Sequence, residues 1–275
     1  MSGTLYVVGT PIGNLGDISP RALETLSNCD FIAAEDTRVT LKLLNRFEIK
    51  KPMVSYFEHN RFERGPMITE RLLSGENCAL VTDAGMPAIS DPGEDLVKLC
   101  IEKGIKVESV PGPCAFTTAL AISGMPSRRF SFEGFLPVEK SARREHISWL
   151  LGETRTMIFY EAPHKLSQTL KDLYTALGDR EIAIVRELTK IHEQVIRTTL
   201  CNAAEKYSKE EIKGEIVLIV GGAQPEEKEE MTLEQAVEYA KELVDKGESK
   251  TVAAKIAAKE SGCKKGDIYK MLTEE

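Results

Sequence analysis

The segment Val81–Gly93, with the sequence VTDAGMPAISDPG, decides the fold class of this chain. An apolar run ends at Asp83, and glycine, proline and aspartate then crowd a turn-rich loop. A parallel strand opens into a binding crevice at its carboxyl end in this way. Asp91 and Pro92 predict a helix start, because aspartate caps a free amide and proline tolerates the first helical position. The expected helix N-terminus lies beside the DAG turn.

Three other segments show the same change from an apolar run to glycine. They are LYVVGTPIGN (5–14), VESVPGPCAF (107–116) and EIVLIVGG (215–222). Several such loops at one edge of a sheet indicate a small-molecule site. They offer backbone amides and carbonyls, few charges and close approach of the chain. The site therefore suits a cofactor held by shape and main-chain hydrogen bonds.

The first part of the chain alternates β-rich apolar runs with amphipathic helical patterns. Strands are expected near 4–9, 30–34, 52–56, 78–82 and 106–110, with helices near 19–28, 38–46, 61–74, 92–103 and 114–123. This alternation predicts a mostly parallel sheet covered by helices, so the fold class is α/β. We assign residues 1–113 to this first α/β domain.

A second α/β domain is expected over residues 114–222. Strands are predicted near 130–135, 155–160, 181–186, 193–200 and 215–221, and helices near 139–151, 163–177 and 202–208. The strand near 193–200 alternates apolar and polar residues, as a half-exposed antiparallel strand does. The two α/β domains should meet around the loops of the first.

The last part of the chain differs in composition. Residues 223–231 (AQPEEKEEM) are acidic and poor in apolar residues, which predicts a linker. Residues 232–275 read as three short helices, broken at Lys246-Gly247 and at Ser261-Gly262. A helical module of this size and spacing is compatible with a helix-turn-helix.

Length and composition limit the class of protein. The chain has 275 residues, 42% of them hydrophobic, and no run approaches the ~20 apolar residues that span a bilayer. The first residues lack a basic region followed by a long apolar core, so we expect a cytoplasmic protein. Six scattered cysteines form no metal-ligand or disulfide pattern, so no metal site is predicted. The net charge of −7 over the whole chain argues against a nucleic-acid partner. Basic residues are nevertheless grouped in some segments.

Common catalytic and nucleotide-binding motifs are absent. GTPIGN does not have the G-x-G-x-x-G spacing of a dinucleotide loop, and there is no GxxxxGK[ST] or HExxH. No serine or cysteine lies in a nucleophile elbow. A nicotinamide dehydrogenase, a P-loop enzyme and a zinc protease are therefore disfavoured.

Seven motifs in order carry a family resemblance. They are LYVVGTPIGNLGDISPRALETL, AAEDTR, VTDAGMPAISDPG, VPGP, FEGFLP, FYEAPHKL and RELTKIHE. Together they resemble the ribosomal RNA small subunit methyltransferase I family of the tetrapyrrole methylase fold superfamily. The resemblance implies two α/β domains with S-adenosyl-L-methionine in the cleft between them, and a homodimer. It also implies methylation of the ribose 2′-oxygen of a cytidine in the decoding region of 16S rRNA, with the small ribosomal subunit as partner.

The resemblance implies cofactor contacts from loops of both domains. The cofactor-binding residues expected from it are Pro11, Ile12, Gly13, Asp83, Ala84, Gly85, Ala88, Cys114, Ala115, Tyr160, Glu161, Leu188, Gly214 and Glu215. Small residues at these positions let the backbone approach the adenosine and methionine portions closely. Methyl transfer from a sulfonium needs no covalent enzyme intermediate, so Cys114 is interpreted as a small packing residue rather than a nucleophile.

A ribose hydroxyl is a poor nucleophile, so the reaction needs in-line alignment and a proton acceptor. We favour Glu161 and Glu187 as the carboxylates nearest the cofactor, and Glu35 with Arg38 as groups that face the substrate. Structural salt bridges are the competing interpretation for each of them.

Basic and polar residues are predicted to rim the cleft and bind RNA, with a solvated surface as the alternative. These are Arg38, His59, Asn60, Arg128, Arg129, Arg143 and Arg144.

Two other functions stay open from the residues alone. One is a methylase of a tetrapyrrole or similar small molecule, since a fold does not fix its substrate. The other is a regulator whose α/β body senses a ligand while residues 232–275 bind nucleic acid. FYEAPHKL and RELTKIHE argue against the first, and the scarcity of arginine in the tail argues against the second.

Overall fold

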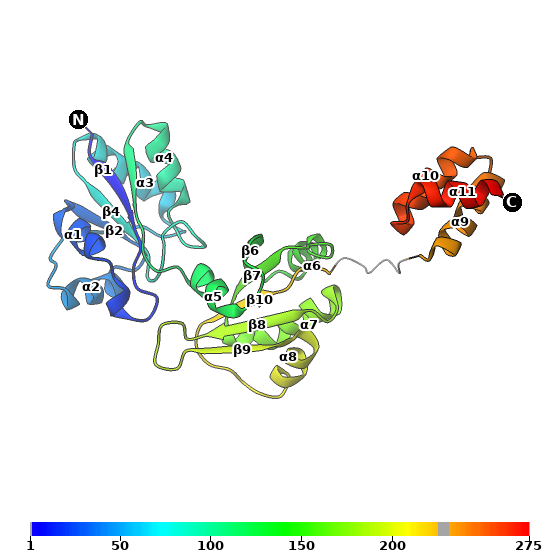
Figure 1. Cartoon of the computed structure of the whole chain (residues 1–275). Helices are drawn as coiled ribbons and strands as arrows, with labels where there is room; N and C mark the ends of the chain where they lie inside the picture. The colour runs from blue at the N-terminus through cyan, green and yellow to red at the C-terminus, as the bar shows by residue number, and fades with distance from the viewer. Residues whose placement is uncertain (1, 225–230, 275) are drawn as a thin grey trace. The chain divides into compact units, whose positions relative to one another are not determined.

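The computed structural model describes residues 2–224 and 231–274. They form two compact units, Met1–Ala223 and Gln224–Glu275. Most of the predicted linker, residues 225–230, lies outside the described residues. Within the first unit the chain builds two five-stranded sheets, one from each half (Figure 1). The predicted α/β class is thereby confirmed.

The first sheet is entirely parallel, in the order β3-β2-β4-β1-β5. Its strands are β1 (Thr4–Val8), β2 (Phe31–Ala34), β3 (Met53–Ser55), β4 (Cys78–Val81) and β5 (Lys106–Val110). The covering helices are α1 (Pro20–Asn28), α2 (Thr37–Arg46), α3 (Arg61–Leu73) and α4 (Glu94–Glu102), with a 3-10 turn η1 (Leu15–Asp17) that sequence patterns did not predict. Buried apolar residues line both faces of the sheet, so β2 and β4 are uniformly buried runs.

One predicted helix start is wrong. Asp91 and Pro92 do not begin a helix, because α4 starts at Glu94 after Gly93 as its N-cap residue. Gly93 has φ +146°, and a Cβ there would lie 3.0 Å from Leu80 Cδ2 and 3.1 Å from the Ala88 nitrogen. Only glycine fits this crowded turn without strain. The helix therefore starts two residues later than predicted, and the carboxyl of Asp91 is left free of any capping role.

The second sheet is mixed, in the order β6-β7-β10-β8-β9. Its strands are β6 (Phe130–Phe135), β7 (Thr156–Glu161), β8 (Glu181–Arg186), β9 (Gln194–Thr199) and β10 (Ile216–Val220). Only β6 and β7 are parallel, and β9 pairs antiparallel with β8 as its alternating sequence predicts. The surrounding helices are α5 (Ala115–Ser123), α6 (Lys140–Trp149), η2 (Pro163–Lys165), α7 (Leu166–Leu177) and α8 (Leu200–Tyr207).

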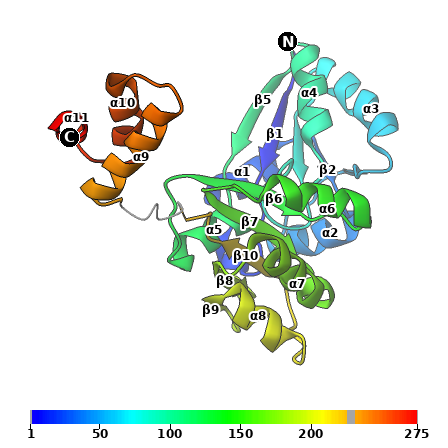
Figure 2. The same cartoon turned by 90° about the vertical axis from the view of Figure 1, so that its right-hand side faces the viewer.

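Helix α5 packs on one face of this sheet and α6, α7 and α8 on the other (Figures 1 and 2). The ends of β7 and β8 and the beginning of β10 come to one edge, because Ile216 is the register partner of both Glu161 and Arg186. That edge carries the loops from which the second sheet contributes to the site.

The second unit contains α9 (Leu233–Asp245), α10 (Lys250–Ser261) and α11 (Lys265–Glu274). Thr232 begins α9 with a capping box, and Gly262 ends α10 in a left-handed conformation. Small side chains such as Ala240, Ala253 and Ala257 form its core and let the helices approach closely. Three helices with these breaks agree with the sequence pattern. The helix-turn-helix interpretation stays a prediction.

Candidate active site

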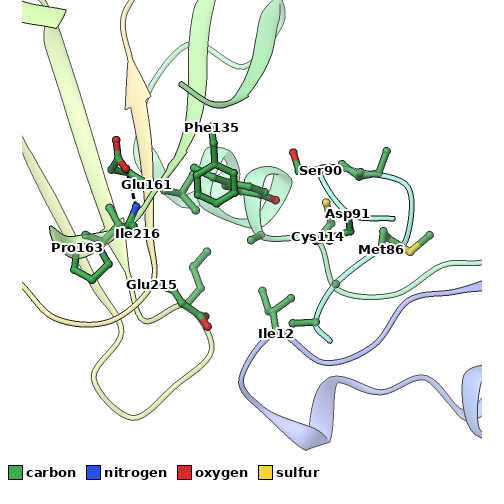
Figure 3. A pocket seen from close by; sticks show the side chains of 18 residues that line it. Ile12, Met86, Ser90, Asp91, Cys114, Phe135, Glu161, Pro163, Glu215 and Ile216 are labelled. Carbon is green, nitrogen blue, oxygen red and sulfur yellow. Dashed lines mark hydrogen bonds between the residues drawn. The ribbon is translucent and has the colours of Figure 1, made fainter. Parts of the chain in front are cut away.

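A cavity of about 380 Å³ lies where the loops of the two sheets meet (Figure 3). Its size falls within the ~300–1,000 Å³ range of small-molecule sites. The first sheet contributes the loops after β1, β4 and β5, and the second contributes the edge formed by β6, β7, β8 and β10. The lining residues are Ile12, Ala84, Gly85, Met86, Ile89, Ser90, Asp91, Cys114, Ala115, Phe135, Tyr160, Glu161, Ala162, Pro163, Leu188, Glu215, Ile216 and Val217.

Close backbone contacts hold the first-sheet loops together. Thr10 and Gly85 exchange two backbone hydrogen bonds of 2.9 and 3.1 Å. A Cβ on Gly112, in the VPGP loop, would lie 2.7 Å from the Gly9 carbonyl oxygen. The loops after β1 and β5 therefore meet only because glycine allows backbone to pack on backbone.

Gly13 joins the loops of the two sheets. A Cβ on it would lie 2.9 Å from Thr189 Oγ1 and 3.0 Å from the Leu188 carbonyl oxygen. Gly13 does not line the cavity, and its contribution is to let the loop after β1 approach the loop after β8.

Strained backbone also gathers around this cavity. Ala88, Ser90, Glu187 and Thr189 have φ values of +68°, +62°, +52° and +64°. Left-handed conformations are costly for residues other than glycine, and such strain concentrates at functional sites. The loops that surround the cavity are therefore held in unusual conformations by the rest of the fold.

Most of the predicted cofactor-binding residues line the cavity. These are Ile12, Ala84, Gly85, Cys114, Ala115, Tyr160, Glu161, Leu188 and Glu215. Pro11, Gly13, Asp83, Ala88 and Gly214 do not line it, although they belong to the same loops. A Cβ on Gly214, at φ +94°, would collide with the Glu187 side chain. Gly214 therefore leaves room for the Glu187 side chain behind the residues that line the cavity.

Sequence patterns missed several lining residues, among them Ser90, Asp91 and Phe135. Phe135 follows a bulge in β6, where the register shifts between Phe132 and Gly134 and Gly134 has φ +61°. A bulge re-aims the side chains that follow it, and no periodicity predicts where it falls. The pattern Asp91-Pro92 predicts a helix cap, and it gives no sign that the Asp91 carboxyl lines the cavity.

The carboxyl of Asp91 is the unpaired acid in the cavity. It forms no hydrogen bond or ion pair with any other residue that the structure describes. Burial raises the pKa of Asp91 to about 7, and the nearby carboxylates of Glu35 and Asp83 contribute to the rise. It therefore titrates near neutrality.

Glu161 is buried, and both of its oxygens already accept hydrogen bonds. Oε1 accepts from the Ala162 amide at 2.8 Å, and Oε2 accepts from the Thr169 hydroxyl. Arg143 Nη2 donates to the same hydroxyl at 2.7 Å, while its Nε donates to Asp172 at 2.7 Å. This network of Arg143, Thr169 and Glu161 forms part of the cavity wall.

Glu187 is also committed to structure. Its Oε1 accepts from the Glu215 amide and from Lys190 Nζ, each at 3.0 Å, and the hydrogen bond from Lys190 lowers the pKa of Glu187. Its side chain does not line the cavity. Glu215 does line it, and its mostly exposed carboxylate pairs with Lys190 at 3.2 Å. The structural salt bridge is thus the interpretation that the geometry supports for Glu187.

Glu35, Asp36 and Asp83 form a chain of hydrogen bonds at the end of β2 and β4. The Asp83 amide donates to Glu35 and the Asp36 amide donates to Asp83, at 3.3 and 3.2 Å. Burial raises the pKa of both Glu35 and Asp83. Arg38 pairs with Asp36 and lowers the pKa of Asp36 to about 2. Neither Glu35 nor Arg38 lines the cavity.

The predicted RNA-binding residues are dispersed over the first unit. His59 is exposed, while the Asn60 side chain bonds the Phe57 amide and the Ser55 carbonyl. Arg128 and Arg129 precede β6, at the end opposite Phe135, so about five residues at ~3.3 Å each separate them from the cavity. The structure does not bring these two arginines to the cleft. Arg143 is held inside the wall network, and Arg144 is exposed beside it.

Aromatic residues close one side of the cavity. The rings of Phe132 and Phe135 contact that of Tyr160 edge to face, with centroids 5.0 and 5.6 Å apart. The Tyr160 hydroxyl accepts a hydrogen bond from the Phe116 amide, and burial raises the pKa of Tyr160 to about 12. Tyr160 is therefore neutral at physiological pH and cannot take up a proton.

The fold and this site define a member of the tetrapyrrole methylase class. The family described as Tetrapyrrole (Corrin/Porphyrin) Methylases matches residues 4–204. The methyltransferase CobJ has the same fold, with a TM-score of 0.61 and 18% identity over 81% of this chain and 95% of that one. The uroporphyrin-III C-methyltransferase of Thermus thermophilus, solved with S-adenyl homocysteine, also has it, with a TM-score of 0.55 and 18% identity over 80% and 97% of the chains.

Closer relatives identify the branch. A protein of Synechocystis sp. named Ribosomal RNA small subunit methyltransferase I is 45% identical over 99% of this chain and 98% of its own length. A Bacillus subtilis protein of the same name is 45% identical over 97% and 93%. The chain belongs to the ribosomal RNA small subunit methyltransferase I family, which confirms the resemblance seen in its motifs.

A shorter relative bears on the second unit. The Thermotoga maritima protein of the same name is 48% identical over 220 residues, which are 80% of this chain but 99% of that protein. A match of that length is close to the extent of Met1–Ala223. This relative, which has the same name, is therefore too short to contain counterparts of both units.

Among the helices that the structure describes, none is long and apolar enough to cross a membrane.

Proposed function

We propose that this protein transfers a methyl group from S-adenosyl-L-methionine to the ribose 2′-oxygen of a cytidine in the decoding region of 16S rRNA. The observation that carries the proposal is near-complete coverage at about 45% identity by relatives named for the small-subunit reaction. The cavity supports it, because its position between the two sheets matches what the family motifs imply. Small ribosomal subunits are the proposed partner, which places the activity in the cytoplasm.

The lining of the cavity fits the methyl donor. Ile12, Leu188 and Val217 would hold the adenosine and thioether portions through apolar surface, and Gly85 would let backbone groups approach closely. Cys114 and Ala115 begin α5 and contribute small side chains. Pro11, Gly13, Asp83, Ala88 and Gly214 act through the loops that hold these lining residues. S-adenosyl-L-methionine, when bound, supplies a methyl group on a positively charged sulfur.

Asp91 is the group that we assign to the ribose proton. Among the described residues, the ionisable side chains that line the cavity are Asp91, Cys114, Tyr160, Glu161 and Glu215. Glu161 has both oxygens bonded, Glu215 is paired with Lys190, and Tyr160 stays neutral. A carboxyl without a partner in a partly dry cavity is a suitable general base near neutral pH.

The proposed chemical step is a direct displacement that moves the methyl group from sulfur to the ribose oxygen. The carboxylate of Asp91 would accept the O2′ proton as the oxygen forms its bond to the methyl carbon. The methyl donor would supply the methyl carbon, and the electron pair of the broken carbon–sulfur bond would stay with its sulfur. Asp91 afterwards releases the proton to water. Proximity and alignment supply much of the rate enhancement in such a transfer.

Glu161 and Glu187, predicted as catalytic, have positioning roles in this proposal. Glu161 holds the end of β7 through the Ala162 amide, and Glu187 fixes the beginning of β10 through the Glu215 amide. Glu35 stays a candidate for facing the substrate, since it lies with Asp83 at the ends of β2 and β4. A homodimer of the chain, which the family resemblance implies, is part of the proposal.

The test uses S-adenosyl-L-methionine labelled in its methyl group. The purified protein is incubated with intact small ribosomal subunits, naked 16S rRNA or a tetrapyrrole precursor, and the label is then located. Label on the 2′-oxygen of a cytidine in the subunit is expected. A labelled tetrapyrrole supports the small-molecule methylase instead, and absence of transfer to all three supports a ligand-sensing regulator.

A further inference from the structure

A second cavity, of about 830 Å³, lies on the outer side of the second sheet. Helices α6 and α7 form its two sides, and the loop after β6 closes one end. The two helices run side by side over the sheet in Figures 1 and 2. We call this cavity the α6–α7 groove. None of its lining residues belongs to the lining of the first cavity, as far as the described residues extend.

Positive charge outweighs negative charge among the side chains that line the α6–α7 groove, although Glu139, just outside the lining, interacts electrostatically with Arg144. Lys140, Arg144 and Lys171 are exposed on its rim, and Lys165 is half-buried. The structure gives none of these four an ion pair with a described residue. The one carboxylate among the described lining residues is Asp172, which is already bonded by Arg143 at 2.7 Å and by Gln168 at 2.6 Å. A chain with a net charge of −7 thus has a basic groove at this place.

The floor of the groove is apolar. Leu136 and Ile147 are buried beneath it, while Val138 and Leu151 are 77% and 53% exposed at its edges. Cations over an apolar floor suit a single-stranded polynucleotide, whose phosphates need charge and whose sugars and bases offer flat, weakly polar surface. No aromatic side chain is among the described lining residues, so stacking on rings does not contribute there. Recognition by charge and shape is therefore the mode that fits.

The groove and the first cavity share a wall. Phe135 lines the cavity and Leu136 lines the groove; likewise Pro163 lines the cavity and Lys165 the groove. Arg143 and Glu161, on the two sides of the wall, are joined through the hydroxyl of the fully buried Thr169. The two cavities are therefore adjacent, and their lining residues alternate along the same stretches of chain.

We propose that the α6–α7 groove binds the RNA backbone of the nucleotides next to the one that is methylated. The inference rests on the proposed function and names the part of the molecule that holds the substrate strand. Exposed lysine and arginine side chains contact phosphates without reading base identity. The groove would thus fix the position of the strand, while the first cavity selects the reacting ribose.

The test is a double charge reversal, Lys140→Glu with Arg144→Glu, in the full chain. The KM for small ribosomal subunits is expected to rise at least tenfold, while the affinity for S-adenosyl-L-methionine and kcat at saturating subunits stay within twofold. Binding of an unstructured oligoribonucleotide should also become less sensitive to salt. The slope of log K against log salt should fall by about one for each phosphate that the variant no longer neutralises.

Two matched variants control for net charge and for the side chains themselves. Lys98→Glu with Lys209→Glu changes the net charge equally on α4 and after α8, and Lys140→Arg with Arg144→Lys keeps the charge of the groove. Both should leave the KM for subunits unchanged. Lys165→Gln with Lys171→Gln repeats the test on the opposite rim, so a folding defect in the first variant does not leave the proposal undecided.

Other outcomes overturn the inference. If subunits are methylated by the wild-type protein and equally well by both groove variants, the groove does not hold the strand, although the proposed function stands. If the variants lose affinity for a polyglutamate peptide but not for the oligoribonucleotide, the occupant is an acidic protein segment. If the wild-type protein methylates no RNA at all, the proposed function fails first, and the oligoribonucleotide assay still decides whether the groove binds RNA.

Discussion

The two cavities of Met1–Ala223 differ in the elements that form them. The first is made by loops at strand ends, with left-handed residues such as Ala88 and Ser90 and the unpaired carboxyl of Asp91. The α6–α7 groove is made by regular helices that present exposed cations such as Lys140 and Arg144. Chemistry on a bound group needs fixed backbone and a partly dry environment, whereas holding a polyanion needs only charge at the surface. The difference assigns reaction to one cavity and retention of the substrate to the other.

The largest effect that this comparison predicts comes from removing the proton acceptor. Asp91→Asn should lower kcat by about 100-fold or more, the range of general base catalysis. The affinity for S-adenosyl-L-methionine, measured by calorimetry, should stay within threefold. The exposed Glu94→Gln serves as control and should behave like the wild type. If Asp91→Asn weakens binding of the methyl donor but leaves kcat at saturation intact, Asp91 binds the donor's ammonium group instead.

The pH dependence of kcat/KM tests the role of Asp91 independently. A carboxylate accepts a proton only when it is ionised, so kcat/KM of the wild type should rise with pH through about 7 and level off above it. Burial raises the pKa of Asp91 most, Glu35 and Asp83 add to the rise, and Tyr160 is the other titratable group on which Asp91 acts. Asp91→Asn should remove this inflection.

Protonation of Asp91 should also make the melting temperature depend on pH. Its pKa is raised in the folded state, so its stabilising contribution is complete below pH ~4 and is lost as pH rises through about 7. Above that pH, Asp91→Asn is expected to melt a few degrees higher than the wild type.

The next effect comes from the packing of the loops around the first cavity. Gly112→Ala places a Cβ 2.7 Å from the Gly9 carbonyl oxygen, so the loops after β1 and β5 must separate. Overpacking of this kind costs about 1–3 kcal/mol, and affinity for the methyl donor should fall by roughly tenfold. Gly152→Ala is the matched control, because nothing lies within 4 Å of its added Cβ. Equal affinities in the two variants would contradict this account of the cavity.

The wall between the cavities can be tested through Thr169. Thr169→Val keeps the shape of the side chain but leaves the buried carboxylate of Glu161 without its hydroxyl partner. Leaving a buried polar group unpaired costs about 1–3 kcal/mol, so the melting temperature should fall by about 5 °C. Thr25→Val, at a partly exposed position of α1, should change it by less than about 1 °C. An unchanged melting temperature for Thr169→Val would show that the wall does not depend on this network.

The smallest effect is expected from removal of the second unit. A chain that ends after Ala223 should bind S-adenosyl-L-methionine within twofold of the full chain, since every described residue that lines the first cavity precedes that point. Calorimetry on both chains measures this. A tenfold or greater weakening would mean that residues 224–275 support the cavity, in spite of the shorter Thermotoga maritima relative.

The sequence predicted the elements closely, because apolar periodicity and turn residues coincide in this chain. Helix α1, which Ser19 caps and Pro20 begins, lies within the range expected near 19–28, and β9 is antiparallel as its alternation indicates. The helix start at Asp91 was wrong, since the crowding around Gly93 is a contact between distant segments. The positions of the small residues were predicted better than the contacts of the charged residues, because those contacts also join distant segments. The position of Ala84 and Gly85 in a motif predicts that they lie at a strand end. It does not predict whether the Arg143 side chain is exposed to solvent or bonded to Thr169.

Local periodicity and motifs in a fixed order were enough to predict the α/β class, the family and the loops that meet at the strand ends. The carboxyl that stays unpaired in the cavity could be identified from the three-dimensional contacts alone. Glu161 and Glu187 take hydrogen bonds from neighbouring elements, while Asp91 takes none from any described residue. The α6–α7 groove likewise needs two helices that are separated in the sequence. The charge state and partners of a side chain depend on contacts across the fold, and no local pattern encodes them.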